Sequence, residues 1–430
     1  MVREMKHTEI GEIPVEWELQ TFGETFCVLS NNTLPRADLN HRGGTVRNIH
    51  YGDILTQFGE VLDCEKNEIP YLNDISLLTA STQVLQDGDV LLADTAEDDT
   101  VGKATEVYGL GKGKMVAGLH TIPCRVKKGD FVPKWLGYYM NSHTYHDQLL
   151  PYIAGIKVSS ISKAAISETL IAVPPVEEQK AIVTVLSEVD GLMVELKKTV
   201  SKLQDFKRGC LYMMFPREGS NVPQIREPEY DDSWEQHKLG ELGNLKNGMN
   251  FPKEAMGHGH FFVNLQNVFG KTMIDIHDLG KAEATRVQLK EYSLMKGDVL
   301  FVRSSVKLEG VGEAAIVPEN LENTTYSGFI IRFRDEYGMS DSFKRFVFST
   351  DRVRSQIMSQ ATDSANKNIS QSVLSNIVIF LPCAKEQEQI GSFFCYLDQL
   401  ITLHQRKLDK YAQIKKAMTS ELITGKIKLV

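Results

Sequence analysis

The chain has 430 residues, of which 42% are hydrophobic and 24% are charged, and its formal net charge is −8. This length predicts two to four domains, and the composition is that of an ordinary globular protein. No apolar run approaches the roughly 18 residues that a membrane-spanning helix needs, and residues 1–10 lack the apolar core of a signal peptide. We therefore expect a cytoplasmic protein without a membrane contact.

Cysteine spacing and the charge distribution restrict the classes of site. No C-x-x-C pair occurs, so we expect no metal site and no disulfide framework, but free buried thiols at Cys27, Cys64, Cys124, Cys210, Cys383 and Cys395. The acidic excess lies in residues 1–215, with 29 acids against 21 bases, whereas residues 216–430 hold 27 of each. The negative net charge argues only weakly against DNA binding, because binding depends on the charge of the surface patch that faces the phosphates.

Residues 1–172 predict a mixed α/β domain, in which short apolar runs at 90–93 and 116–126 alternate with Gly-rich turns. Residues 173–215 then predict a long helix. Pro174-Pro175 marks its start, since proline fits a first helical turn, and Glu177-Glu178 follow where the helix dipole favours acids. Apolar residues then recur at coiled-coil spacings of three and four: Ile182, Val185, Val189, Leu192, Leu196, Leu203, Phe206 and Cys210.

Residues 216–380 and 381–430 predict the same plan again, with β-type runs at 299–302 and 329–333 and a second helix after Pro382. The apolar stripe of this helix shifts near His404 and comprises Ile390, Phe393, Leu397, Leu400, Leu408, Tyr411, Met418 and Leu422. A helix of about 35 residues is about 50 Å long. We expect the two helices to bury their stripes against each other in an antiparallel coiled coil; the alternative is that each helix packs on its own domain.

Matching segments show that the two halves are copies of one module. VSSISKAAISETLIAVP at 158–174 matches NKNISQSVLSNIVIFLP at 366–382 at an offset of 208, and Glu178-Gln179 matches Glu386-Gln387 at the same offset. Earlier in each half, Gly-Asp-Val-Leu recurs at 88–91 and 297–300. Trp17 matches Trp234, so the offset drifts only from 217 to 208. This period is too long for a solenoid and indicates two copies of one module.

A domain of about 170 residues, an Ile-Ser segment and a helix start in which proline is followed by Glu-Gln, all repeated, resembles the specificity subunits of type I restriction-modification enzymes. The resemblance implies two target-recognition domains, at 1–172 and 216–380, that each read one half of a bipartite double-stranded DNA sequence. It implies that the helices, at 173–215 and 381–430, form an antiparallel spacer. It also implies that the spacer docks two methyltransferase subunits, which bind S-adenosylmethionine, and that two motor-nuclease subunits using ATP and Mg²⁺ complete the restriction enzyme. The chain itself would carry no cofactor.

Catalytic motifs are missing from the sequence. No (N/D)-P-P-(F/Y) tetrapeptide, Walker loop, H-E-x-x-H or G-x-S-x-G motif occurs, so we expect a non-catalytic chain. One alternative is a nuclease or methyltransferase that uses Asp94, Glu97 and Asp98. The matching segment 303–307 has no acids, which argues against a shared catalytic centre. A second alternative is a protein-binding helical scaffold that binds no DNA.

Three pairs of segments are candidates for reading DNA, because arginine, asparagine and glutamine match base edges and lysine neutralises phosphate. The segments after Gly-Asp-Val-Leu offer Asp94, Thr95 and Lys103 in the first copy and Arg303, Ser304, Ser305 and Lys307 in the second. The segments before Ile-Ser offer Lys157, Ser159 and Ser160, and Asn366, Lys367 and Asn368. A weaker pair offers Arg47 and His50, and Asn264, Gln266 and Asn267.

Each candidate also has a purely structural interpretation. Ser160 or Ser162, and Asn368 or Ser370, are suitable N-caps for a following helical turn, and the third pair is compatible with strand-edge positions. The copies agree in scaffold but differ in charge at the first pair of segments, where Asp94 stands against Arg303. We therefore expect the two domains to recognise different half-sites, so that the whole target is asymmetric.

Overall fold

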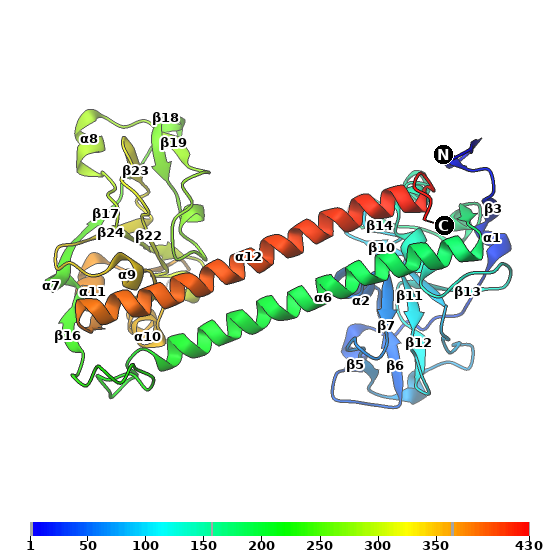
Figure 1. Cartoon of the computed structure of the whole chain (residues 1–430), viewed down its shortest axis with the longest axis horizontal. Coiled ribbons are helices and arrows are strands. Elements are labelled where there is room, and N and C mark those ends of the chain that lie inside the picture. Colours follow the sequence, from blue (N-terminus) through cyan, green and yellow to red (C-terminus); the bar gives the residue numbers. More distant parts are fainter. Residues whose placement is uncertain (1–2, 156–157, 363–364, 430) are drawn as a thin grey trace. The chain divides into compact units, whose positions relative to one another are not determined.

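The computed structural model describes residues 3–155, 158–362 and 365–429 and divides into two compact units (Figure 1). Unit 1 comprises Met1–Glu195 and Lys407–Val430, and unit 2 comprises Leu196–Arg406. Two long helices run from one unit into the other: α6 (Val176–Met213) begins in unit 1, and α12 (Ala384–Ile423) begins in unit 2. Each unit therefore contains one α/β module and part of both helices.

Unit 1 is built on two sheets. The main sheet has the order β4 (Phe26–Val28), β13 (Thr121–Val126), β9 (Val90–Ala93), β11 (Ala104–Tyr108) and β7 (Val61–Asp63). The second has the order β12 (Lys114–Ala117), β6 (Val46–Ile49), β8 (Tyr71–Leu72) and β5 (Leu39–Asn40). Three strand pairs complete it: β1 (Met5–Thr8) with β2 (Gly11–Pro14), β3 (Glu18–Thr21) with β15 (Leu170–Val173), and β10 (Thr95–Ala96) with β14 (Ser159–Ser160). Its short helices are α1 (Phe22–Thr25), α2 (Tyr51–Thr56), α3 (Trp135–Met140), α4 (His143–His146) and α5 (Lys163–Ile166).

Unit 2 repeats this plan with fewer strands. Its main sheet has the order β17 (Gly243–Asn247), β24 (Ile330–Asp335), β20 (Val299–Val302) and β22 (Ala314–Ile316). The second sheet has the order β19 (Gly280–Ala282), β18 (Met256–Val263) and β23 (Thr324–Tyr326). Two strand pairs match those of unit 1: β16 (Glu235–Lys238) with β26 (Val378–Leu381), and β21 (Ser304–Ser305) with β25 (Lys367–Asn368). Its short helices are α7 (Leu239–Leu242), α8 (Arg286–Glu291), α9 (Asp341–Val347), α10 (Asp351–Ser359) and α11 (Gln371–Asn376).

The mixed α/β class and the duplication predicted from the sequence are confirmed. The central antiparallel strands β13 and β9 of unit 1 correspond to β24 and β20 of unit 2, and β6 pairs parallel to β12 as β18 pairs parallel to β23. The run at 116–126 is two strands rather than one, because residues 118–120 form the connection between β12 and β13.

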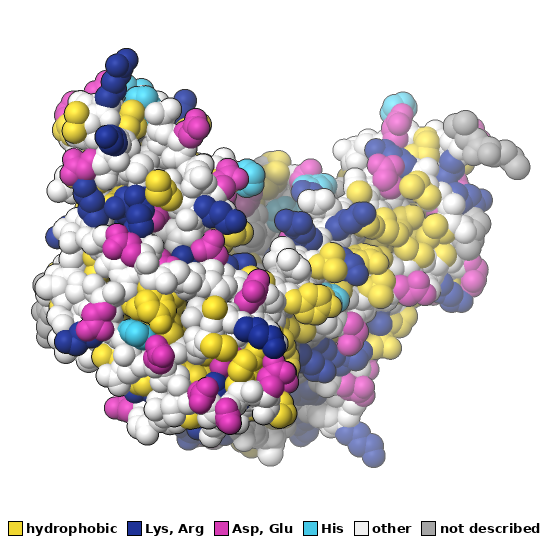
Figure 2. All heavy atoms as spheres, turned by 60° about the vertical axis from the view of Figure 1, so that its left-hand side comes forward, with side chains coloured by type: hydrophobic (Ala, Val, Ile, Leu, Met, Phe, Trp, Pro, Cys, Tyr) yellow, Lys and Arg dark blue, Asp and Glu magenta, His cyan; other side chains and the backbone are white. Residues whose placement is uncertain are grey.

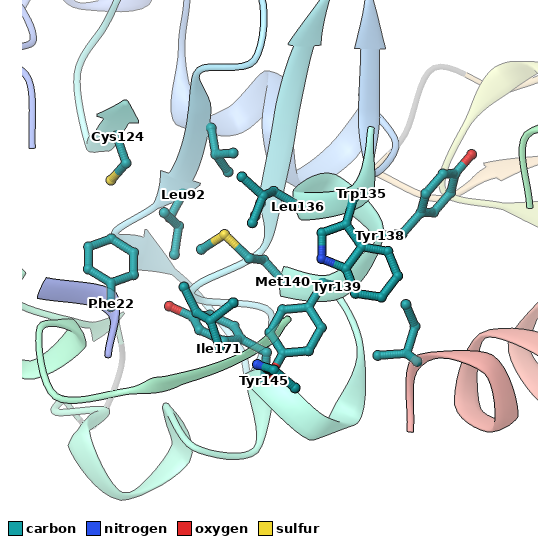
Figure 3. Packing of buried hydrophobic residues seen from close by; sticks show 14 of the residues in the cluster. Phe22, Leu92, Cys124, Trp135, Leu136, Tyr138, Tyr139, Met140, Tyr145 and Ile171 are labelled. Atoms are coloured by element: carbon teal, nitrogen blue, oxygen red, sulfur yellow. Dashed lines mark hydrogen bonds between the residues drawn. The ribbon is translucent and has the colours of Figure 1, made fainter. Parts of the chain in front are cut away.

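Each core is completed by the end of a long helix. In unit 1, helix α3 places Trp135 and Tyr139 among residues from the sheets, such as Leu92 and Ile171 (Figure 3), and Leu422 and Ile423 of α12 belong to the same cluster. In unit 2, Cys210 near the end of α6 and Phe215 just after it pack with Trp234 and Phe343. Full burial of one large apolar side chain is worth about 1.5–3 kcal/mol, so both helix ends contribute to the stability of the unit in which they finish.

The aspartate of the Gly-Asp-Val-Leu motif is a buried carboxylate that pairs with a partly exposed arginine in both copies. Asp89 is 1% exposed and Asp298 is 2% exposed. Each accepts two hydrogen bonds from one guanidinium, Asp89 from Arg125 at 2.8 and 2.7 Å and Asp298 from Arg334 at 2.8 and 2.6 Å. Bidentate pairing of this kind compensates the carboxylate for leaving water. The aspartate thereby connects the middle strands of each main sheet.

The Glu-Gln pair of the segment Pro-x-x-x-Glu-Gln, which occurs in both copies, anchors the first turn of each long helix. The carboxylate of Glu178 lies between the guanidinium of Arg3, at 2.5 and 2.7 Å, and the indole Nε1 of Trp17, at 2.9 Å. Glu386 makes the equivalent contacts with Arg226, at 2.7 Å to both oxygens, and with Trp234 at 3.3 Å. In both copies the following glutamine side chain donates to the carbonyl of the proline five residues earlier: Gln179 to Pro174 and Gln387 to Pro382.

Antiparallel pairing of the two helices is confirmed within each unit, and the start of each helix also packs on its own module: Ile182 of α6 lies in the core of unit 1 and Ile390 of α12 in the core of unit 2. In unit 1, Lys415 of α12 lies 2.7 Å from Asp190 of α6. In unit 2 the roles are exchanged, since Lys207 of α6 lies 2.5 Å from Asp398 of α12. Lys207 and Lys415, like Asp190 and Asp398, are related by the offset of 208, so each copy supplies one acid and one base. Glu60 also pairs with Lys415, and the two acids outweigh the effect of burial and raise the pKa of this lysine.

The predicted apolar stripe is only partly buried. Ile182 and Val189 of α6 and Ile390 and Leu397 of α12 are buried, but Leu192 is 50% exposed and Phe206 is 54% exposed. Leu186 and Val200 are buried in their place. An α-helix has 3.6 residues per turn rather than 3.5, so a stripe assigned by strict heptads drifts off the buried face. The expectation of buried thiols is also wrong for Cys27 and Cys383, which are exposed, although all six cysteines are free.

Replacing Glu178 with glutamine should destabilise unit 1 by up to about 3 kcal/mol, because the Arg3 guanidinium loses its buried counter-charge and is left with the more exposed Glu16, at 2.8 Å. Glu177→Gln is the matched control, since the Glu177 side chain is 76% exposed and pairs with Lys180, its neighbour on the same helix. Hydrogen exchange followed by mass spectrometry would report the two units separately. Equal protection of unit 1 in the two variants would contradict the anchoring role.

Glu106 predicts a pH-dependent stability of unit 1. Burial raises its pKa from 4.5 to about 7, although the backbone N–H groups of Lys134 and Gly137 donate to its carboxylate. A folded-state pKa above the unfolded value means that the native state binds the proton more tightly. The contribution is therefore complete below pH 4.5 and is lost as the pH rises through 7. Urea unfolding at pH 5 and pH 8 should show this loss, and Glu106→Gln should flatten the pH slope. An unchanged slope in Glu106→Gln would exclude Glu106 as its origin.

Candidate nucleic-acid interface

The first two pairs of candidate segments come together in each unit as a two-stranded ladder. In unit 1, β10 pairs antiparallel with β14, so that Thr95 faces Ser160 and Ala96 faces Ser159; we call this the first ladder. In unit 2, β21 pairs antiparallel with β25, so that Ser304 faces Asn368 and Ser305 faces Lys367; we call this the second ladder. The segment after Gly-Asp-Val-Leu and the segment before Ile-Ser therefore belong to one surface in each copy.

The backbone around the two ladders is equivalent. Asp94, directly before the first ladder, accepts from Ile161 N at 2.9 Å and donates to the His120 carbonyl at 3.1 Å. Arg303 accepts from Ile369 N at 2.9 Å and donates to the Phe329 carbonyl at 2.8 Å. Asp94 and Arg303 are thus one structural position that carries opposite charges in the two copies.

In unit 1 the side chains beside the first ladder form a hydrogen-bonded group. Asp94 Oδ1 accepts from Thr95 Oγ1 at 2.7 Å and lies 3.1 Å from His120 Nδ1. The His120 ring meets the ring of Tyr51 edge-on, at a centroid distance of 5.3 Å. The His120 side chain is 44% exposed. This group presents one carboxylate, one hydroxyl and one imidazole at the surface.

In unit 2 the same place is cationic and apolar. Arg303 Nη1 donates to the Gly328 carbonyl at 3.2 Å, which orients the guanidinium, and Phe329 is 56% exposed. Ser305 Oγ accepts from Lys307 N at 3.2 Å, and Lys307 is exposed. Asn368 Nδ2 donates to the Asn366 carbonyl at 2.7 Å. The second ladder therefore offers groups that suit phosphate and guanine contacts.

Two candidates of the first copy are differently placed. Lys103 directs its ammonium inward, where Nζ donates to the Leu55 carbonyl at 3.0 Å, and burial lowers its pKa. The ammonium of Lys103 therefore has a structural role inside unit 1 and is not presented beside the first ladder. Lys157 lies outside the described residues.

The third pair of segments is engaged within the fold. Arg47 donates to the carbonyls of Cys64 and Leu110, and burial lowers the pKa of His50, which caps α2 by accepting from Gly52 N. Asn267 is 1% exposed and donates to the carbonyls of Asp275 and Asp278. Asn264 caps a short helical turn that begins at Leu265. Gln266 is exposed.

The helix-capping interpretation applies to the serines of the Ile-Ser motif. Ser162 Oγ accepts from Ala165 N, and Ser370 Oγ accepts from Val373 N. Ser160 and Asn368 lie in the ladders instead. The caps are therefore made by Ser162 and Ser370, whereas Ser159, Ser160, Lys367 and Asn368 lie in the ladders.

The acidic cluster does not converge on a cation site. Asp98 accepts from Thr100 N at 3.0 Å, and Glu97, Asp98 and Asp99 are exposed. Over residues 3–155, 158–362 and 365–429 no group of three or more His, Cys, Asp or Glu side chains is arranged to hold a metal ion. In the same ranges, no helix combines the length and the apolar character needed to cross a bilayer.

His120 and Phe329 were missed by the sequence interpretation. They are separated by 209 positions, the same offset that relates Asp94 to Arg303, so alignment of the two copies could have paired them. Neither lies in a recognisable motif, however, and only the connections before β13 and β24 bring them beside the ladders. On the face of unit 2 shown in Figure 2, Lys and Arg side chains alternate with Asp and Glu, so contact with DNA would depend on local groups rather than on one broad basic field.

Comparison with known proteins gives a consistent result. The profile of the family described as "Type I restriction modification DNA specificity domain" matches residues 14–203 and 231–413. A Methanocaldococcus jannaschii protein named as the MjaX type I restriction enzyme specificity subunit is 24% identical over 434 residues, covering 99% of this chain and 96% of that protein. The EcoKI specificity subunit of Escherichia coli is 23% identical over 303 residues, covering 68% of this chain and 65% of that protein.

Solved structures share the fold over nearly the whole chain. The crystal structure of a type I restriction-modification S subunit from M. genitalium superposes with a TM-score of 0.53 at 13% identity, covering 98% of this chain and 99% of that one. A chain from a structural study of type I R-M complex assembly superposes with a TM-score of 0.58 at 15% identity, covering 96% and 99%. The two profile matches include both α/β modules and most of both long helices, so the chain belongs to the type I restriction-modification DNA specificity family.

Proposed function

We propose that this chain gives a type I restriction-modification enzyme its DNA sequence specificity and has no catalytic role of its own. Residues 1–172 and 216–380 are the two target-recognition domains, and residues 173–215 and 381–430 form the spacer. The observation that carries the proposal is the pair of ladders, which share one backbone frame and differ in charge at Asp94 and Arg303. Two surfaces that share a backbone arrangement but differ in charge are suited to an asymmetric, bipartite double-stranded DNA target.

The long helices are the proposed docking surface for two methyltransferase subunits, which would bind S-adenosylmethionine. Apolar side chains that the chain itself leaves exposed support this assignment: Leu192 on α6 in unit 1, and Tyr396 and Leu403 on α12 in unit 2, are 50%, 60% and 49% exposed. Exposed apolar groups on a helix favour burial by a partner. Two restriction subunits, which would use ATP and Mg²⁺, join through the methyltransferases in this assembly.

Adding the chain to its cognate methyltransferase subunit should confer adenine methylation at one bipartite sequence, and the chain alone should methylate nothing. Tritium transfer from labelled S-adenosylmethionine to plasmid DNA measures both. A gel shift with the modification subunit present separates this function from a scaffold without DNA contact. Methylation by the purified chain alone, or assembly without any DNA binding, would refute the proposal.

Lengthening the spacer should lengthen the unread gap between the half-sites. One heptad inserted into α6 between Leu196 and Leu203, and one into α12 between Leu400 and Leu408, adds about 10 Å of helix, or about three base pairs. Mapping of methylated adenines should then show unchanged half-sites and a longer gap. The control is a substitution of the exposed Gln413 of α12, which keeps the length. An unchanged gap would mean that the helices do not set it.

A further inference from the structure

His120 and Phe329 occupy one structural position in the two units, at the tip of the connection that precedes β13 or β24. Each carbonyl accepts from the residue that directly precedes a ladder, His120 from Asp94 and Phe329 from Arg303. Both side chains are large and exposed, at 44% and 56%. Each ladder therefore has one projecting ring beside it, an imidazole in unit 1 and a phenyl ring in unit 2.

The backbone of His120 has an unusual conformation. Its φ of 55° lies in the left-handed region, which residues with a side chain rarely adopt. Such conformations persist where the surroundings impose them, and they gather at functional sites. Asp94 and Tyr51 supply these surroundings by a hydrogen bond to one edge of the ring and an edge-on aromatic contact. The imidazole is therefore preorganised before any ligand arrives.

The hydrogen bonds fix what the neutral ring presents. Asp94 Oδ1 accepts from the Thr95 hydroxyl and, as a carboxylate, can only accept from His120 Nδ1 as well. Thr95 Oγ1 lies 3.2 Å from Nδ1 and, with its own proton directed at Asp94, can also only accept from it. Nδ1 then carries the proton of the neutral imidazole, and Nε2 on the opposite edge of the ring is an acceptor. In the major groove, hydrogens for such an acceptor come from the amino groups of adenine N6 or cytosine N4, whereas guanine O6 and thymine O4 would repel it.

The equivalent position of unit 2 has the opposite preference. Phe329 offers an apolar surface that suits the 5-methyl group of thymine, and Arg303, anchored by Gly328, offers donors that suit guanine O6 and N7. No acceptor nitrogen faces the base from this position. The second ladder would thus favour the keto bases that the first would reject.

We infer that the ring at position 120 or 329 is a specificity-determining contact: His120 selects an amino base in the half-site read by unit 1, and Phe329 selects thymine in the half-site read by unit 2. This inference rests on the proposed function and adds to it the residue that sets the base and the chemical class of that base. It also explains how two copies with one backbone frame read different sequences.

The test uses the full chain assembled with its methyltransferase subunit, and it maps methylated adenines for the wild type, His120→Phe and Phe329→Ala. His120→Phe should change the preferred base at one position of one half-site by about 5- to 150-fold, toward thymine, with the other half-site unchanged. Phe329→Ala should relax one position of the other half-site by a similar factor. His143→Ala and Tyr337→Ala are matched controls, because these exposed residues of units 1 and 2 lie on α4 and in the turn after β24.

The outcomes separate the inference from the proposed function. A wild-type assembly that methylates no defined sequence contradicts the proposed function itself. A wild-type bipartite sequence that His120→Phe leaves unchanged at every position overturns the inference alone. If His120→Phe assembles but methylates nothing, binding selection from duplexes randomised over the half-site decides between them, since selection of the wild-type base also overturns the inference.

Discussion

The buried glutamate in the first turn of each long helix is the interaction on which the architecture depends. Glu178 and Glu386 are 3% and 2% exposed, and each joins an arginine and a tryptophan near the start of the module to the helix that leaves it. A carboxylate in such a place is stable only with its charge matched and its lone pairs used. The direction in which each helix departs is therefore fixed by electrostatics as well as by apolar packing.

The scaffold of each module and the surface that carries the two ladders depend on different physical interactions. This difference explains which parts of the structure the sequence could predict. Buried ion pairs such as Asp89 with Arg125 require particular residue types at particular places, so they leave matching motifs in both copies. Proline and acids at the helix starts are equally local signals. The α/β class, the duplication and the antiparallel helices were all predictable for this reason.

The details of the candidate interface were less predictable, because they depend on contacts between segments far apart in the chain. The pairing of β10 with β14 joins residues 65 positions apart, from Thr95 to Ser160, and no local sequence pattern predicts this pairing. Lys103 looked suitable for phosphate by its place in the sequence, but its ammonium is bonded inside the unit. The stripe on α6 failed at Leu192 because heptad spacing only approximates the true helical period.

The way the chain closes on itself has a consequence for the order of folding. Unit 2 is one continuous stretch, Leu196–Arg406, whereas unit 1 needs the last residues of the chain, since Leu422 and Ile423 lie in its core and Arg3 donates to the Gly425 carbonyl. During synthesis the module made second can be complete while the module made first still waits for its final helix. Domains usually fold in the order in which they emerge from the ribosome. Here the N-terminal unit cannot be complete before residues 422–425 have been made, so part of its apolar core stays open while the rest of the chain is synthesised.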